Sequence, residues 1–210
     1  MKLYCATTNP GKVREFEHAA GELFPGEFEF ALLPDFRRIH PPRETGGTFA
    51  ENAALKAAYY SRHVAGLVFA DDSGLAVDAL GGEPGVHSAR FSGDGATDES
   101  NNRMLLEKLE DEDNRNARYV CVIALATEGR LLGTFEGHVE GEILREARGD
   151  GGFGYDPYFL YPPFGLTFGE ATKEQKLRVS HRGHALRAML EFLKATKHAQ
   201  AGVHSSQASG

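Results

Sequence analysis

Two adjacent carboxylates directly follow an apolar run in the segment LVFADDSGLAVDALGGEPG, residues 67–85. The run from Leu67 to Ala70 has the β-rich composition of a short buried strand, which we expect to end at Asp71 and Asp72. Carboxylates there lose hydration and repel each other, so capping, a salt bridge or a metal ion must compensate them. Side chains alternate between the faces of an extended strand, so the two should point to opposite sides.

This alternation leaves two interpretations of the aspartate pair. In the first, one carboxylate faces a cleft and the other anchors loop backbone; in the second, both bind turn N–H groups. A hard cation such as Mg²⁺ fits an oxygen-only site held by one or two carboxylates and substrate phosphates. Ser73 and Gly74 are expected to bend the chain after the aspartates, and Ser73 would then offer its hydroxyl or N–H to a ligand.

The stretch TTNPGK, residues 7–12, joins an expected strand to an expected helix. Free backbone N–H groups, the positive end of a helix dipole and the Lys12 ammonium are together what a phosphate group requires. The stretch is not a Walker A loop, because the leading glycine is missing and Val13 follows the lysine. An ordinary strand-to-helix turn is the alternative, since Asn-Pro-Gly is strong turn chemistry by itself.

Two further segments have residues that could recognise a planar base. The loop GDGGFGYDP, residues 149–157, combines glycines that permit close backbone approach with Phe153, Tyr155 and Asp156, which could stack on a base or read its edge. The segment SHRG places His181 and Arg182 in the first turn of a helix, where basic residues oppose the dipole. A purine 6-keto oxygen would explain them, and the alternative is solvation or bonding to an acidic loop.

Alternating strands and helices must position these residues. The predicted strands cover residues 2–7, 28–33, 67–70, 117–126, 131–139 and 158–161. A helix is predicted over 11–24, and capping residues predict others after Thr48, which forms a capping box with Glu51, after Thr97 and after Ser180. The pattern predicts an α/β fold in which a long mixed β-sheet with flanking helices forms two lobes around a central cleft. We expect one domain over residues 1–195 and a disordered tail over 196–210.

The composition narrows the class of function. The 210 residues include 23 Lys and Arg and 30 Asp and Glu, a net charge of −7, which argues against sequence-independent binding to DNA or RNA. The two cysteines, Cys5 and Cys121, lie in apolar runs and indicate a reducing compartment and simple packing. No stretch approaches the roughly 18 apolar residues of a membrane span, and no signal-peptide pattern is present. We expect a cytoplasmic protein that binds neither nucleic acid nor membrane.

Five segments occur together in the order and spacing of a known family: TTNPGK, ETGGTFAENAALKA, FADDSGLAVDALGGEPGVHSARFSG, GGFGYDPYF and EATKEQKLRVSHRGHAL. Over nearly all of residues 1–195, the chain resembles the inosine triphosphate pyrophosphatases of the Ham1/RdgB-like type. The resemblance implies a homodimer with an elongated α/β fold. It also implies hydrolysis of ITP, dITP and XTP to the monophosphate and pyrophosphate with Mg²⁺ as cofactor, which removes deaminated purines from the nucleotide pool.

Transferred to this sequence, the resemblance makes Asp72 the general base and a metal ligand. The substrate contacts that it implies are Thr7, Thr8, Asn9, Pro10, Gly11, Lys12, Lys56, Ser73, Phe153, Gly154, Tyr155, Asp156, Lys176, His181 and Arg182. The family often has two adjacent glutamates before Thr-Gly, one of them a metal ligand, where this chain has Arg43 and Glu44. Glu44 is therefore the expected second ligand, with Glu51 or water as substitutes.

Two other functions fit parts of the same pattern. A Maf-like pyrophosphatase acting on dTTP or modified pyrimidines would use a similar cleft, although the FGYD and SHRG segments match the purine family better. A nucleotide-sensing module would bind without turnover and would have no need of a base at Asp72. The substitution Asp72→Asn therefore distinguishes an enzyme from a sensor.

Overall fold

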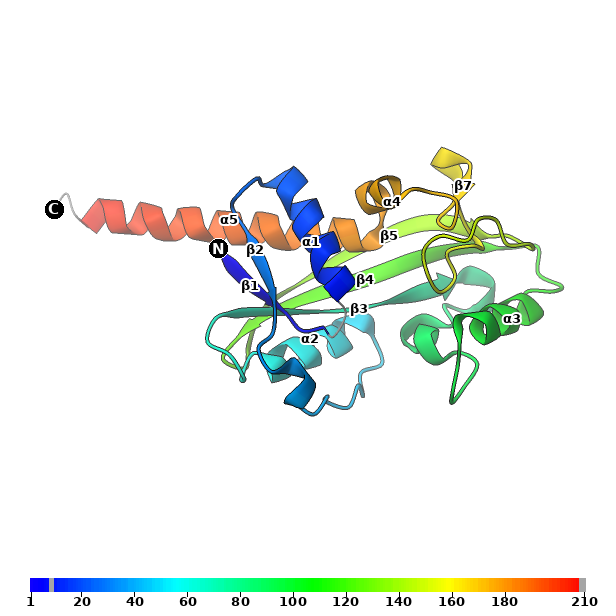
Figure 1. Cartoon of the computed structure of the whole chain (residues 1–210), viewed down its shortest axis with the longest axis horizontal. Coiled ribbons are helices and arrows are strands. Elements are labelled where there is room, and N and C mark those ends of the chain that lie inside the picture. Colours follow the sequence, from blue (N-terminus) through cyan, green and yellow to red (C-terminus); the bar gives the residue numbers. More distant parts are fainter. Residues whose placement is uncertain (8–9, 208–210) are drawn as a thin grey trace.

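The computed structural model describes residues 1–7 and 10–207, and in them seven strands form one mixed sheet (Figure 1). The strands are β1 Lys2–Cys5, β2 Glu29–Leu32, β3 Leu67–Val77, β4 Asn116–Thr127, β5 Arg130–Ile143, β6 Phe159–Tyr161 and β7 Leu166–Thr167. Their order across the sheet is β2-β1-β3-β4-β5-β6-β7. β1 runs parallel to β2 and β3, and the later pairs are antiparallel, which confirms the predicted mixed sheet and its long β4–β5 hairpin.

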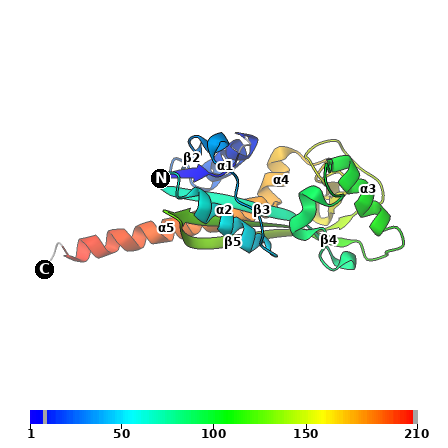
Figure 2. The same ribbon diagram turned by 90° about the horizontal axis from the view of Figure 1, so that it is seen from below.

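The α-helices cover both faces of the sheet. They are α1 Pro10–Leu23, α2 Phe49–Tyr60, α3 Asp98–Lys108, α4 Lys173–Val179 and α5 His181–Gln207. Phe16 of α1 and Met189 of α5 share a buried cluster with Phe69 of β3, whereas Ala53 of α2 packs with the next strand residue, Ala70. Figure 2 shows α2 in front of the strands and α5 behind them. Neighbouring residues of β3 contact helices on opposite faces of the sheet. Successive side chains along β3 therefore have different chemical surroundings.

The chain reverses its direction of winding next to β1. From β1 the chain passes through α1 to β2 on one side, and then crosses through α2 to β3 on the other side, with α1 and α2 on opposite faces. In open α/β sheets such a switch point leaves a crevice outside the carboxyl ends of the strands, where ligands bind. From Ala70 to Leu75, β3 has no strand partner on its β1 side in the described part of the chain. The fold therefore places a cleft beside the aspartates.

The two lobes have separate apolar cores along this one sheet. One cluster joins α1, α5, β1, β2 and the near halves of β3 and β4, and includes Cys5 and Cys121, both buried as expected. A second cluster, with Leu75, Leu105 and Phe159, joins α3 to the far ends of β3, β4 and β5 (Figure 1). Among the described residues, no helix combines the length and apolar character needed to cross a membrane.

The structure differs from the sequence prediction in the length of β3. We expected this strand to end at Ala70, but it continues through the aspartates, Ser73 and Gly74 to Val77, paired with β4 along its length. The expected bend at Ser73 and Gly74 is therefore wrong. Carboxylates are tolerated inside a sheet here because basic side chains from distant helices compensate them, and local sequence does not show such partners.

The helix boundaries agree with the capping signals, with two differences. Thr48, Thr97 and Ser180 each accept the expected hydrogen bond from the backbone N–H three residues on. The helix α4 was missed, although its capping box is plain in the sequence T-K-E-Q, with Thr172 as the N-cap. The helix α5 extends as far as Gln207, into the segment 196–210 for which we expected disorder, and that expectation remains a prediction.

Candidate functional site

The turn predicted to hold phosphate lies at the carboxyl end of β1. Thr7 follows the strand, and its N–H donates to the carbonyl of Cys5 at 3.0 Å. Thr8 and Asn9 lie outside the described residues, as do the side chains of the next three residues predicted to bind substrate: Pro10, Gly11 and Lys12. The helix α1 begins at Pro10, a position at which proline is favoured. The described residues thus place the end of β1 and the start of α1 on either side of this segment, and its binding of an anion remains a prediction.

Asp71 and Asp72 point to opposite faces of the sheet, as strand alternation predicts. Asp71 Oδ2 lies 3.6 Å from Nε of Arg182, at the start of α5. Asp72 Oδ1 accepts a hydrogen bond of 2.8 Å from Nζ of Lys56, on α2. The two carboxylates therefore lie in different surroundings, and Asp72 is the one that contacts an ammonium group.

Lys56 connects Asp72 to the predicted second acid, Glu44. The ammonium nitrogen is 2.8 Å from Asp72 Oδ1 and 3.2 Å from Glu44 Oε1. Burial raises the pKa of Asp72 above its usual value, and the Glu44 charge adds to this, against the opposing effect of the Lys56 hydrogen bond and charge. The pKa of Lys56 is also raised, because the attraction of these carboxylates outweighs its desolvation. A carboxylate of raised pKa accepts a proton more readily, which suits a general base.

The donor atoms around Asp72 are those that a hard cation prefers. Asp72 Oδ2 is buried and has no hydrogen-bond partner among the described residues, and Glu44 adds a second carboxylate. No group of three or more acidic, histidine or cysteine side chains in the described part of the chain could hold a metal ion alone. These residues fit Mg²⁺, which is commonly held by one or two carboxylates with substrate phosphates and water completing its coordination.

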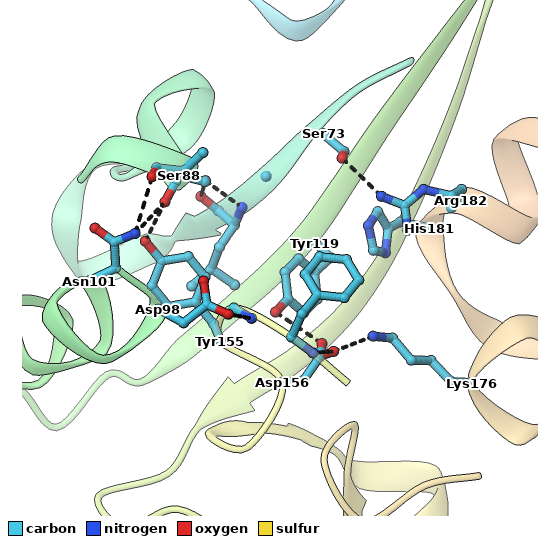
Figure 3. A pocket seen from close by; sticks show the side chains of 15 residues that line it. Ser73, Ser88, Asp98, Asn101, Tyr119, Tyr155, Asp156, Lys176, His181 and Arg182 are labelled. Atoms are coloured by element: carbon cyan, nitrogen blue, oxygen red, sulfur yellow. Dashed lines mark hydrogen bonds and ion pairs between the residues drawn. The ribbon is translucent and has the colours of Figure 1, made fainter. Parts of the chain in front are cut away.

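A pocket lies on the other side of the cleft, between β3, the loop 152–156 and the start of α5 (Figure 3). It has a volume of about 150 Å³ and adjoins a second hollow of about 390 Å³ under α4. The predicted residues that line the pocket are Ser73, Phe153, Gly154, Tyr155, Asp156, Lys176, His181 and Arg182. The structure therefore brings the residues predicted to form the base pocket together with two other predicted substrate contacts, Ser73 and Lys176, from segments up to more than 100 positions apart in the sequence.

Asp156 is the centre of the hydrogen bonding in this pocket. Its carboxylate accepts from the Tyr119 hydroxyl at 3.2 Å and from the Phe153 N–H at 2.9 Å, and it forms an ion pair with Lys176. Lys176 Nζ also lies 5.0 Å from the centre of the Phe153 ring. Asp156 thereby fixes both the loop that carries Phe153 and the nearby ammonium group.

His181 and Arg182 are buried at the start of α5, and neither is solvated as the alternative proposed. The His181 ring stacks on Tyr119 with 4.8 Å between centroids and 12° between planes. Burial, with the nearby charges of Arg182 and Lys176, lowers the pKa of His181 well below its usual value, so the imidazole is neutral at pH 7. Its Nδ1 has no hydrogen-bond partner among the described residues, which leaves one ring nitrogen for a ligand.

Sequence reasoning missed several residues that build this pocket. Tyr119 lies in the apolar run of β4, where nothing marks it as a polar partner. Asp98 lines the pocket from the first turn of α3, where an acidic residue is ordinarily explained by the helix dipole. Ser88 was missed as well: its carbonyl accepts a hydrogen bond of 2.8 Å from the hydroxyl of Tyr155, a predicted residue, and this bond anchors the Tyr155 ring in the pocket wall.

This fold and site define a mixed α/β protein with a cluster of two carboxylates and a lysine and a separate pocket lined by aromatic and basic side chains. The model of the Ham1 family matches residues 3–192. A dITP/XTP pyrophosphatase of Acidobacterium capsulatum is 48% identical over 92% of this chain and 98% of its own length. A dITP/XTP pyrophosphatase of Thermus thermophilus is 50% identical, with 92% of each chain covered.

The solved structures agree with the sequence relatives. The Ham1 protein of Staphylococcus aureus superimposes with a TM-score of 0.83 at 38% identity, covering 93% of this chain and all of its own. A nucleoside-triphosphatase, or dITP/XTP pyrophosphatase, of Mycobacterium abscessus gives 0.73 at 41% identity, covering 92% of this chain and 100% of its own. This chain belongs to the Ham1 family.

Proposed function

We propose that this protein hydrolyses the triphosphates of deaminated purines, ITP, dITP and XTP, to the nucleoside monophosphate and pyrophosphate. The observation that carries this proposal is the Asp72–Lys56–Glu44 cluster at the switch point of the sheet, across the cleft from a pocket suited to a base. The relatives named dITP/XTP pyrophosphatase match this chain over 90% or more of its length, which supports the same reaction and substrates.

The phosphate side of the cleft supplies the hydrolytic chemistry. The turn at residues 7–12 binds the triphosphate through its N–H groups and Lys12. Asp72 takes a proton from a water molecule, whose oxygen bonds to the α-phosphorus as the bond to the bridging oxygen of pyrophosphate breaks. Lys56 holds Asp72 in place and offsets charge on the leaving group. Asp72 and Glu44 would hold Mg²⁺, which would supply Lewis-acid chemistry at the phosphate.

The pocket side supplies the choice of base. Phe153 offers an exposed ring for stacking, and Lys176, Arg182 and neutral His181 offer N–H donors. Hypoxanthine and xanthine present a 6-keto acceptor, whereas the 6-amino group of adenine would face donors. An unmatched polar contact of this kind can exclude the wrong base by up to about 10⁴-fold.

The cellular setting follows from the same proposal. We infer a homodimer in the cytoplasm that acts on free nucleotides. The net charge of −7 supports a small-molecule substrate over a nucleic acid, because binding to polynucleotides needs an extended basic surface.

Pyrophosphate release tests the proposed function directly. We would assay the wild type and Asp72→Asn with Mg²⁺ on dITP, XTP, dATP, GTP and dTTP. We expect turnover of dITP and XTP, reduced about 10³-fold in Asp72→Asn because the base is lost. A preference for dTTP would indicate the Maf-like activity instead. Binding of dITP without turnover by the wild type would identify a sensor and overturn the proposal.

A further inference from the structure

The peptide of Gly154 is held on both sides by α3. Asp98 Oδ2 accepts a hydrogen bond of 2.7 Å from the Gly154 N–H, and Asn102 Nδ2 donates one of 2.9 Å to the Gly154 carbonyl (Figure 3 shows Asp98). The two side chains lie four residues apart and so share one face of the helix. Gly154 has a φ of +62°, in the left-handed region that glycine adopts without strain. Its backbone groups are therefore bonded to protein, although Gly154 was predicted to bind substrate.

We call the hydrogen bonds of Asp98 and Asn102 to Gly154 the grip. The residue that this grip would position is Phe153. Its side chain is 58% exposed and lines both the pocket and the adjoining hollow. Lys176 Nζ and Arg182 Cζ lie 5.0 and 5.9 Å from its ring centre. An aromatic side chain on a loop that has so few apolar neighbours has few contacts that fix its position. The hydrogen bonds of the neighbouring Gly154 backbone and of Asp156 must therefore fix it.

Neither side chain of the grip is needed to form or dock the helix itself. The start of α3 is capped by the Thr97 and Ser100 side chains, which bond to each other's backbone. Asn101 attaches the helix to the preceding segment through Ser92 and the carbonyl of Ser88. The contacts of Asp98 and Asn102 with Gly154 thus serve the loop, which lies 52 or 56 positions further along the chain.

We propose that Asp98 and Asn102 are positioning residues for base recognition, which fix the Gly154 peptide and thereby hold the Phe153 ring where the purine stacks. The inference rests on the proposed function, because it assigns the pocket to the base of the nucleotide. Holding the ring in place before binding removes the cost of ordering the loop in the complex. In the described part of the chain, no hydrogen bond or ion pair joins α3 to Asp72, Lys56 or Glu44, so loss of the grip should weaken base binding and leave pyrophosphate binding unchanged.

The test compares four variants that separate the grip from the helix. Asp98→Ala and Asn102→Leu each remove one hydrogen bond, and Asn102→Leu also removes the buried, unpartnered Oδ1 with little change of volume. Asp98→Asn keeps an oxygen acceptor and serves as the conservative rescue. Glu99→Gln is the matched control, since Glu99 is an exposed acid in the same first turn. Calorimetry measures the Kd of deoxyinosine monophosphate and of pyrophosphate, and amide exchange follows the Gly154 N–H.

We expect Asp98→Ala and Asn102→Leu to weaken monophosphate binding and raise the KM for dITP, each about tenfold, as for one lost hydrogen bond to a charged or buried group. Pyrophosphate binding and kcat should stay at wild-type values, and Gly154 should exchange faster. Asp98→Asn and Glu99→Gln should resemble the wild type. Unchanged monophosphate binding in both disruptive variants would overturn the grip while wild-type turnover of dITP still supports the proposed function. A wild type that binds no monophosphate and turns over no dITP would overturn both.

Discussion

On the pocket side of the cleft, Asp156 bonds to Tyr119, Lys176 and the Phe153 N–H, whereas on the phosphate side Asp72 shares a single lysine with Glu44. The first carboxylate is saturated by protein partners before any ligand arrives. The second retains an oxygen, Oδ2, without a hydrogen-bond partner in the described part of the chain.

This difference indicates how the two walls contribute to function. A wall whose polar groups bond to one another is preorganised, and it can reject a base that does not match its remaining donors and acceptors. In the described part of the phosphate side, Lys56 is one cation beside two carboxylates, and a divalent cation would add positive charge there when the substrate binds. The pocket side is thus built to discriminate, and the phosphate side is built to bind charge and react.

Replacing Lys56, on the phosphate side, gives the largest effect among the variants that compare the two sides. Lys56→Met leaves Asp72 and Glu44 as neighbouring carboxylates without their ammonium, so one of them takes up a proton more readily. We expect kcat/KM for dITP to fall about 100-fold, from lost general-base function and lost charge stabilisation. Steady-state kinetics measure the effect.

The matched control for this variant is Lys108→Met. Lys108 also forms an ion pair, 2.7 Å from Glu83, but both side chains are exposed and distant from the cleft. This variant should leave kcat/KM within twofold of the wild type, as expected for a surface pair. An equal loss in the two lysine variants would show that the Lys56 effect is not specific to the cluster.

The pair Asp71–Arg182 tests whether the pocket side depends on its internal bonds. Arg182→Gln breaks the buried ion pair between Arg182 and Asp71, which should lower the free energy of unfolding by about 3 kcal/mol. The double variant Asp71→Asn/Arg182→Gln removes both charges and should recover most of this stability. Urea unfolding measures all three forms and the coupling between the sites.

The kinetics of the same variants distinguish stability from recognition. Because Arg182 lines the pocket and donates to Ser73 Oγ at 3.4 Å, the KM for dITP should stay raised in the double variant. If the double variant instead recovered both stability and KM, Arg182 would have no role in base binding, and the donors would be those of Lys176 and His181.

The sequence alone was sufficient for the local features of this site. The strand β1 and the helix α1 on either side of residues 8–9, the capped start of α2 and the opposite orientation of Asp71 and Asp72 all follow from short-range rules of periodicity, caps and alternation. The resemblance to a family then brought the FGYD and SHRG segments to one pocket, which no periodicity could have done.

What could not be predicted depends on contacts between distant parts of the chain. The strand β3 runs through its aspartates because Lys56 and Arg182 compensate them, one 16 and the other more than 100 positions away. In the sequence, Tyr119 is indistinguishable from the other apolar residues of β4. Only the fold brings its hydroxyl within hydrogen-bond distance of Asp156. Burial decides the charge state of His181, and burial is a property of the whole structure.

The neutral state of His181 gives stability a predictable dependence on pH. Its pKa is lowered in the folded protein by burial and by Arg182, whereas in the unfolded chain it is about 6.5. Below that value the unfolded chain binds a proton that the native protein does not, so stability is lost as the pH falls. Relative to His181→Gln, the wild type should lose about 1.4 kcal/mol between pH 7.5 and pH 5.5.

Chemical unfolding at the two pH values measures this difference. The control is His87→Gln, because His87 is exposed and should change stability equally at both. A wild type and a His181→Gln variant that lose the same stability on acidification would contradict the assignment of a neutral, buried imidazole.

The smallest effect that we expect comes from removing a single oxygen atom on the pocket side. Tyr119→Phe keeps the ring that stacks on His181 and packs against Phe159, but it removes the hydroxyl that donates to Asp156 Oδ1 at 3.2 Å. Asp156 keeps Lys176 and the Phe153 N–H, so it stays anchored and the fold should lose only about 1 kcal/mol.

The preference of Tyr119→Phe for dITP over dATP is a more sensitive measure of this variant than its stability. The ratio of kcat/KM for dITP to that for dATP should fall a few-fold, because a less firmly held Asp156 lets Lys176 and the Phe153 loop adjust to the wrong base. Turnover of dITP itself should change little, since Tyr119 pairs with Leu75, three residues beyond Asp72 on β3, and its partners Asp156 and His181 belong to the pocket side. A Tyr119→Phe variant with reduced kcat and unchanged selectivity would place this hydroxyl on the catalytic side of the comparison and contradict the division between a discriminating wall and a reacting one.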